Sequence, residues 1–318
     1  MFYAPAHLAI VVPTKDRPQK IRTLLDSLSA QTVKCGRIVI IDGGASVRDL
    51  ILGYADRLPI EHHTCPSPGQ IRQRNMGIAL LDTGTPLVAC LDDDIVFEPE
   101  AMERMVSFWN ACEAETAAVS FNIVNVPPEP DSWVRRLFGI AGAEPGRVLP
   151  SGATTSNCQA ARDYRTDWVC GGATVWRLDV LHRHPHRELP SRWAIHEDVI
   201  YSYPLSRIYP MYVCAGARVR HEHVVDYGAK RHYQFYGLTQ TLWMLYMVET
   251  NQNLSMPALL WTIFGTATGR ILAGTFGFQR RHLQFARGQV EAVRKVAWAH
   301  LRGRDVASVI EAEAARAR

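Results

Sequence analysis

The first part of the chain alternates continuous apolar runs with segments whose apolar residues recur every three or four positions. Residues 8–12 (LAIVV) form such a run, which is typical of a strand buried on both faces of a sheet. Residues 18–30 show helical spacing instead. This alternation predicts an α/β fold with a mixed, mostly parallel sheet and helices on both faces. Further strands are expected at residues 37–41, 59–63 and 86–91, and further helices at 47–54, 71–81 and after Pro99.

Polar residues follow three of these strands at the point where each strand ends. They are residues 14–17 (TKDR), 42–44 (DGG) and 92–94 (DDD). Ligands of open α/β sheets collect beyond the carboxyl ends of the strands. The sequence therefore predicts a ligand site at this edge of the sheet.

The pattern changes in the second half of the chain. Residues 126–165 are rich in Pro, Gly and Ser, which predicts a long functional loop. After Tyr227 the pattern is helical, so we expect a catalytic α/β domain at residues 1–228 and a helical C-terminal extension at 229–318. The extension is expected to contain helices at residues 233–248, 257–272, 282–301 and 306–318.

The composition narrows the class of protein. Hydrophobic residues make up 47% and charged residues 21% of the 318 residues, a balance typical of a folded chain. The formal charge of +4 is too small to require a nucleic-acid partner. Basic residues gather after about residue 268, where they could meet phosphates or anionic lipids or simply form a solvated helix surface.

The cysteines and the hydropathy of the chain indicate where in the cell the protein is expected. The seven cysteines are scattered without a C-x-x-C pair, which favours reduced thiols in the cytoplasm over a zinc site or disulfides. No signal peptide is expected, because the N-terminal apolar run lacks a preceding basic segment. Residues 256–269 carry no charge but fall short of the roughly 20 residues that span a bilayer. A cytoplasmic protein is therefore expected, in solution or at the inner face of the plasma membrane.

The acidic triplet of Asp92, Asp93 and Asp94 is the first candidate for chemistry. Adjacent carboxylates repel one another unless cations attend them, and Mg²⁺ or Mn²⁺ prefers such oxygen ligands. Asp92 and Asp94 are two positions apart, so they point the same way if the backbone stays extended. A solvated acidic turn that precedes a helix is the alternative interpretation.

Two further clusters have both a structural and a functional interpretation. Glu197 and Asp198 follow His196 at the start of a predicted helix, where carboxylates match the helix dipole or serve as a general base. Strands are also expected at residues 211–214 and 217–220. His221 and His223 flank Glu222 after the second of them, where a histidine is either structural or a metal ligand.

Taken together, the motifs resemble the GT-A family of inverting glycosyltransferases that is often called family 2. Each motif alone is unspecific, whereas six in this order are specific, and they span roughly residues 8 to 225. The resemblance implies a Rossmann-like GT-A fold. The motifs are residues 12–17 (VPTKDR), 41–44 (IDGG), 69–77 (GQIRQRNMG), 91–94 (LDDD) followed by Pro99, 171–172 (GG) and 197–198 (ED).

The resemblance implies that the chain binds a nucleoside-diphosphate sugar. Asp42 would hydrogen-bond the base, Thr14 and Asp16 would line the nucleotide pocket, and Arg74 would lie near the base or the phosphates. The full set of donor-binding residues implied in this way is Pro13, Thr14, Asp16, Arg17, Asp42, Gly43, Arg74, Asp92, Asp93, Gly171 and Gly172.

The resemblance also implies the catalytic machinery. Asp92 and Asp94 would hold Mn²⁺ or Mg²⁺ against the donor diphosphate, with His221, or else His223, as a third contact. Asp198 would take the proton of the acceptor hydroxyl as that hydroxyl attacks the anomeric carbon in a single inverting displacement, and Glu197 would orient the acceptor.

The helical tail resembles the extension of rhamnosyltransferase-like bacterial enzymes that build surface polysaccharide. This implies a saccharide or a polyprenyl-diphosphate-linked saccharide as acceptor. The tail could contact the membrane as a peripheral helix pair, pack on the catalytic domain, or form a homodimer, and these interpretations stay open. Two other functions are alternatives: a non-catalytic scaffold of the same fold, and a sugar-1-phosphate nucleotidyltransferase, which residues 12–17 disfavour because they lack glycine.

Overall fold

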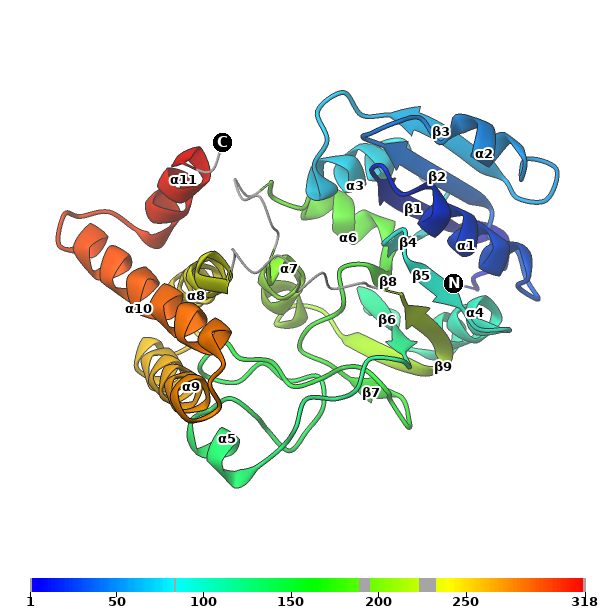
Figure 1. Cartoon of the computed structure of the whole chain (residues 1–318). Helices are drawn as coiled ribbons and strands as arrows, with labels where there is room; N and C mark the ends of the chain where they lie inside the picture. Colours follow the sequence, from blue (N-terminus) through cyan, green and yellow to red (C-terminus); the bar gives the residue numbers. More distant parts are fainter. Residues whose placement is uncertain (1, 83, 189–194, 223–232, 317–318) are drawn as a thin grey trace. The chain divides into compact units, whose positions relative to one another are not determined.

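The computed structural model describes residues 2–82, 84–188, 195–222 and 233–316, and the chain forms two compact units (Figure 1). The first unit comprises Met1–Pro128, Asn157–Glu188 and Tyr201–His223, and it contains the sheet. The second comprises Glu129–Ser156, Leu189–Ile200 and Val224–Arg318. The expected boundary between residues 228 and 229 lies outside the described residues, and that division stays a prediction.

One mixed sheet of nine strands organises the first unit. Its order is β3-β2-β1-β4-β8-β6-β9-β5, and β7 pairs with β9. The strands β3, β2, β1 and β4 are mutually parallel, whereas β8 runs antiparallel to both β4 and β6. The expected α/β fold with a mixed sheet is confirmed. The strands are β1 (Leu8–Thr14), β2 (Arg37–Asp42), β3 (Ile60–Thr64), β4 (Leu87–Leu91), β5 (Ile95–Phe97), β6 (Ala118–Ile123), β7 (Tyr164–Arg165), β8 (Ala173–Arg177) and β9 (Met211–His221).

The continuous apolar runs are explained by burial on both faces of this sheet. In β1, Ile10 and Val12 pack into one core, and Val11 packs into the core on the other face. Each fully buried aliphatic side chain of this kind contributes about 1.5–3 kcal/mol. Helices α1 (Pro18–Ser29), α2 (Arg48–Leu52) and α4 (Ala101–Ala111) supply the first core, and α3 (Gln70–Ala79) and α6 (Leu178–Arg183) supply the second.

The antiparallel half of the sheet departs from the sequence expectations. Strands β5, β6 and β8 were not predicted, because β5 is only three residues long and β6 and β8 mix polar with apolar residues. The two strands expected at residues 211–214 and 217–220 form the single strand β9. Its register against β6 shifts between Phe121 and Asn122, so an irregularity of the bulge type accounts for the break in the pattern.

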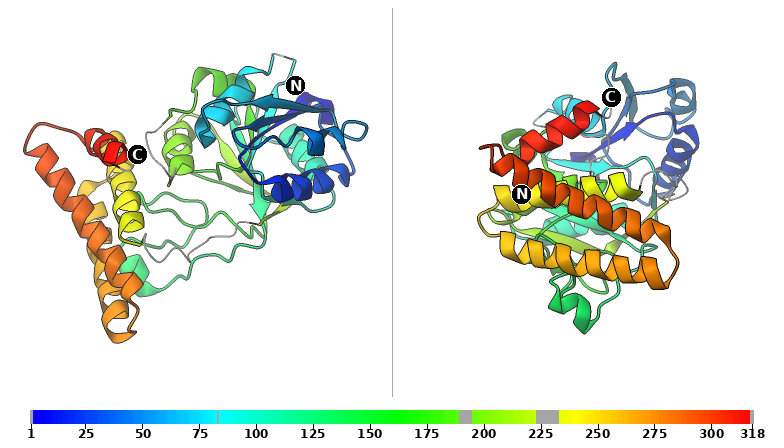
Figure 2. Two further views of the ribbon diagram at one scale, coloured as in Figure 1. Left: turned by 45° about the horizontal axis from the view of Figure 1, so that its top comes forward. Right: turned by 60° about the vertical axis from the view of Figure 1, so that its left-hand side comes forward.

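The second unit is helical, and its four C-terminal helices form close to where the spacing predicted them. Figure 2 shows α8, α9 and α10 side by side. A Cβ at Gly288 would lie 2.0 Å from the carbonyl oxygen of Gln234, so only glycine allows α8 and α10 to approach this closely. Among the described helices, none is both long and apolar enough to cross a membrane. The remaining helices are η1 (Pro5–His7), α5 (Trp133–Leu137), α7 (Glu197–Ser206), α8 (Tyr233–Thr250), α9 (Met256–Phe276), α10 (Arg280–His300) and α11 (Val306–Arg316).

Gln73 on α3 ties together the ends of the two central parallel strands. Its buried Nε2 donates to the carbonyl oxygens of Thr14 and Ile41, both at 2.8 Å. Its Oε1 accepts a 3.2 Å hydrogen bond from the backbone N–H of Gly69, which precedes α3. Three loops at the carboxyl edge of the sheet are thereby fixed to one side chain.

We expect Gln73→Ala to destabilise the first unit. The substitution leaves two buried carbonyl oxygens and one N–H without this partner, which costs about 2–4 kcal/mol in the free energy of unfolding. Urea unfolding followed by circular dichroism measures this loss. The exposed Gln19 on α1 provides the matched control, and Gln19→Ala should change stability by less than about 0.5 kcal/mol. Equal midpoints for the two variants would contradict the role of Gln73.

Candidate functional site

Backbone hydrogen bonds pin both ends of the acidic triplet at the carboxyl end of β4. The N–H of Asp92 donates to the carbonyl oxygen of Gly172 at 2.9 Å, and the carbonyl oxygen of Asp94 accepts from the N–H of Glu222 at 2.8 Å. The triplet therefore bridges the segment before β8 and the segment after β9. The backbone of the triplet is therefore held on both sides.

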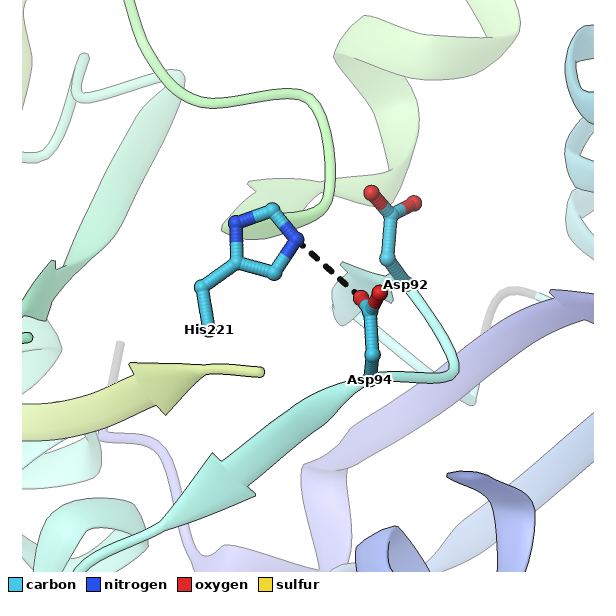
Figure 3. Close-up of side chains that lie close together, drawn as sticks. All are labelled: Asp92, Asp94 and His221. Carbon is cyan, nitrogen blue, oxygen red and sulfur yellow. Dashed lines mark ion pairs between the residues drawn. The ribbon is translucent and has the colours of Figure 1, made fainter. Parts of the chain in front are cut away.

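Asp92, Asp94 and His221 converge on one point of the first unit (Figure 3). Each offers one ligand atom, and these atoms all lie within 4.8 Å of one another. His221 is the last residue of β9, and the antiparallel pairing sets it opposite Ile95, next to Asp94. Its Nε2 lies 3.0 Å from Oδ1 of Asp94. These are the three residues expected to hold a cation, and that role stays a prediction; His223 lies outside the described residues.

Asp93 points away from this cluster, toward β1. Its carboxylate accepts from the hydroxyl of Thr14 at 2.7 Å and from the guanidinium of Arg17 at 2.5 Å. Burial raises the pKa of Asp93 to about 6, against the lowering effect of both partners. Asp93 thus serves to connect the triplet to the loop after β1.

Asp94 is held in its ionised form by its neighbours. Burial acts to raise the pKa of Asp94, but the bond with His221 and the 2.7 Å ion pair with Arg17 outweigh it, and its pKa lies well below the usual range. The same contact works in reverse on His221: burial lowers the pKa, Asp94 raises it, and the net shift is upward. Arg17 therefore bridges two carboxylates that would otherwise repel one another.

Asp92 is positioned by side chains of α3. Gln70 Nε2 donates to its Oδ1 at 3.0 Å, and Nη2 of Arg74 lies 3.5 Å from the same oxygen. The side chain of Arg74 is fully buried, whereas a quarter of the Asp92 side chain is exposed. In this structure Arg74 supports Asp92 from the protein side. Gln70 was not singled out from the sequence, because nothing local marks a contact to a residue on another element.

Gly172 makes room for the carboxylate of Asp92. A Cβ at this position would lie 2.2 Å from Oδ2 and from Cγ of Asp92, closer than any real contact. Gly171 precedes it in the same turn, directly before β8. Gly172 therefore has a steric explanation, because any side chain at this position displaces Asp92.

The loops after β1 and β2 lie side by side at the same edge, because Thr14 pairs with Asp42 in the parallel register. The Asp42 carboxylate is buried and accepts from the N–H groups of Gly44 and Val47, both at 3.0 Å. Asp16 is exposed, has φ of 56°, and accepts from the N–H of Ala45 at 2.7 Å. Asp42 shapes its own loop, and Asp16 joins the two loops.

Close packing fixes the rest of this edge. Pro13 is buried within β1, and the N–H of Gly43 donates to the carbonyl oxygen of Thr14 at 2.9 Å. A Cβ at Gly43 would lie 2.7 Å from Cβ of Pro68, so this position has no room for a side chain. The structure thus gathers the residues expected after β1, β2 and β4 along one edge.

Glu197 and Asp198 begin α7 in the second unit. His196 before them has φ of 60°, a left-handed conformation uncommon for a residue with a side chain. Burial lowers the pKa of His196 to about 4, so the imidazole is neutral at pH 7. Its Nε2 lies 3.3 Å from Nε2 of Gln240 on α8. Asp198 Oδ1 accepts from the N–H of Val199 at 2.9 Å.

Comparison with known proteins identifies the family. The family model described as glycosyl transferase family 2 matches residues 9–184, which is more than half of the chain. Among curated proteins, no significant match was found.

Solved structures share the fold. A mannosyltransferase from Pyrobaculum calidifontis, in complex with GDP-Man and Mn²⁺, aligns with a TM-score of 0.55 and 14% identity, covering 92% of this chain and 88% of the other. Residues 1–349 of S. aureus TarS align with a TM-score of 0.51 and 13% identity, covering 98% and 92%. The same protein in complex with UDP gives 0.50 and 13%, covering 93% and 92%. The family match and the shared GT-A fold agree, and the chain belongs to glycosyl transferase family 2.

Proposed function

We propose that this glycosyltransferase moves a sugar from a nucleoside-diphosphate donor to a hydroxyl group of a saccharide or lipid-linked saccharide, in one inverting displacement assisted by a divalent cation. The convergence of Asp92, Asp94 and His221 at the edge of the sheet carries the proposal, because it supplies a cation site next to the loops expected to bind the donor.

The loops after β1 and β2 and the structural relatives support a nucleoside-diphosphate sugar as the donor. The two relatives of known fold are described with GDP-Man and with UDP, both of which contain a nucleoside diphosphate. In this chain the exposed Lys15 and Asp16 and the partly exposed Arg17 are polar side chains available to a donor beside β1. We assign Pro13, Thr14, Asp42 and Gly43 to the wall of the nucleotide site, together with Gly171, Gly172 and Asp93.

The donor atoms in the candidate cation site suit Mn²⁺ or Mg²⁺. Two carboxylates and one imidazole form an anionic, mostly oxygen donor set, and the absence of sulfur disfavours Cu⁺ and iron–sulfur clusters. Asp92 and Asp94 would hold the ion, with His221 as a third ligand. When bound, the ion would neutralise the negative charge that grows on the departing diphosphate. The Mn²⁺ in the mannosyltransferase complex is consistent with this choice.

Asp198 is assigned as the general base. Its carboxylate would accept the proton of the acceptor hydroxyl while that oxygen bonds to the anomeric carbon, and the bond from this carbon to the diphosphate oxygen breaks with its electron pair. Glu197 is buried beside it and would orient the acceptor. Residues 195–198 carry a strained backbone at His196, which is common where a structure holds a functional side chain in place.

We expect a nucleoside diphosphate to stabilise the protein in a cation-dependent manner. A ligand that binds only the folded state raises the free energy of unfolding, by about 2.7 kcal/mol at a ligand concentration of a hundred times its Kd, and so raises the melting temperature. The measurement is a thermal-shift panel of UDP, GDP, TDP and CMP, each with Mn²⁺ or with a chelator. One diphosphate should raise the melting temperature with Mn²⁺ and lose its effect with the chelator. Equal shifts under both conditions would contradict the role of Asp92 and Asp94.

Asp198→Asn should abolish transfer without abolishing donor binding. The amide cannot take a proton, and loss of a general base costs about 10²–10⁴-fold in rate. The measurement is release of the nucleoside diphosphate in the presence of acceptor, with donor affinity determined in parallel. Asp56 is four-fifths exposed, and Asp56→Asn serves as the control with full activity. A non-catalytic scaffold would show no transfer even in the native chain, which would overturn the proposal.

Gly172→Ala should weaken cation binding at the site by displacing Asp92. The added methyl group has no space beside the carboxylate, so Asp92 must move while the fold persists. We expect the Mn²⁺ concentration for half-maximal activity to rise about ten-fold or more. Gly216→Ala is the control, because its Cβ would meet only ordinary contacts at 3.7 Å. An unchanged Mn²⁺ dependence would show that Asp92 does not bind the ion.

A further inference from the structure

Helix α9 is apolar around its whole circumference, and one side of it is exposed. Arg270 is its single charged residue. Leu259, Ile263 and Ala267 face the core of the second unit. The opposite side is also apolar, although it faces solvent. Its exposed large side chains are Leu260, Trp261, Phe264, Ile271, Leu272 and Phe276.

Helix α5 extends this exposed row. Trp261 Nε1 donates to the carbonyl oxygen of Leu137 at 2.9 Å, and the ring of Phe138 lies 5.0 Å from that of Trp261. A Cβ at Gly265 would lie 2.3 Å from the Phe138 ring, so α5 is packed tightly on α9. Trp133 on α5 is three-quarters exposed, and Val134 and Leu137 are exposed as well. We call this row on α5 and α9 the α5–α9 face.

The number of exposed apolar side chains on the α5–α9 face indicates that this face binds a partner. Single exposed apolar residues are ordinary on soluble proteins, whereas a continuous row marks an interaction surface. Among the residues that the structure describes, the exposed positions of α9 include no charged side chain. Water alone is therefore a poor solvent for this side of the helix.

The charges at the end of the face indicate what the partner is. Phe278, in the turn after α9, is 92% exposed, and the exposed Arg280 and Arg281 follow it directly. Within the described residues, neither arginine forms an ion pair with a carboxylate. Aromatic and aliphatic side chains next to unpaired arginines match the boundary between acyl chains and anionic headgroups.

We propose that the α5–α9 face docks on a bilayer that contains anionic lipid, with α9 lying in the headgroup region. No described helix is suited to crossing a membrane, which agrees with a helix that lies along the surface. Trp133 and Trp261 would sit at the interface, and Arg280 and Arg281 would contact lipid phosphates. This binding is independent of the transfer reaction and can be tested without activity.

The test is co-sedimentation of the full chain with vesicles. One set contains phosphatidylcholine alone, and in the other half of the lipid is phosphatidylglycerol. The native chain should bind the second set, and binding should weaken as salt is added. Leu260→Gln, Ile271→Gln and Leu272→Gln combined should weaken binding at least about ten-fold, because each removes apolar area from the contact. Arg280→Gln with Arg281→Gln should remove the preference for phosphatidylglycerol.

A matched control separates this surface from general hydrophobicity. Leu52 and Ile208 in the first unit are similarly exposed, and Leu52→Gln with Ile208→Gln should bind vesicles like the native chain. Melting curves establish that every variant is folded. Absence of native binding to phosphatidylglycerol vesicles, or native-like binding by the triple variant, would overturn the proposal. A native dimer that the triple variant converts to a monomer, without vesicle binding, would make the face an interface between copies and overturn it too.

Discussion

Repulsion among the three carboxylates after β4 is the constraint to which the surrounding structure responds. Arg17 bridges Asp93 and Asp94, Thr14 holds Asp93, and His221 faces Asp94. The three adjacent aspartates therefore have different roles. Asp93 is turned inward and anchors the loop after β1, while Asp92 and Asp94 remain on the side where a cation and a diphosphate could be held.

Sheet topology makes this arrangement possible. Strand β4 lies between β1 and β8, so the triplet meets the loop after β1 on one side and the glycine pair before β8 on the other. The antiparallel pair of β5 and β9 then brings His221 beside Asp94, although the two residues lie far apart in the chain. Parallel strands therefore supply the donor loops, and antiparallel strands complete the cation site.

The second unit contains a helix, α9, that is apolar on two sides. Its helices bury a core of their own, with glycines that let α8 and α10 touch, yet α9 keeps a second apolar side that this core does not use. A helix that only stabilised a fold would gain nothing from exposed Trp, Phe and Leu side chains. The membrane proposal rests on α5 and α9, whereas the transfer proposal rests on the sheet edge of the first unit and on Asp198. Either proposal can fail without the other.

The sequence by itself determined the parallel strands, most of the helices and the presence of an acidic cluster, because continuous apolar runs and helical spacing are local signals of burial. Helices α5 and α6 were not expected, and α5 lies within the predicted loop of residues 126–165. The spacing of Asp92 and Asp94 also indicated that these two would act on the same side. Tertiary structure alone decided that Arg17 pairs with Asp93 and Asp94, that Gln70 and Arg74 support Asp92, and that Asp42 is taken up by its own loop. Strands β5, β6 and β8 escaped prediction because β5 is short and β6 and β8 mix polar with apolar residues. Contacts between residues far apart in the chain produce no periodic pattern in the sequence. They depend on which strands become neighbours and on the space that a residue such as Gly172 leaves open.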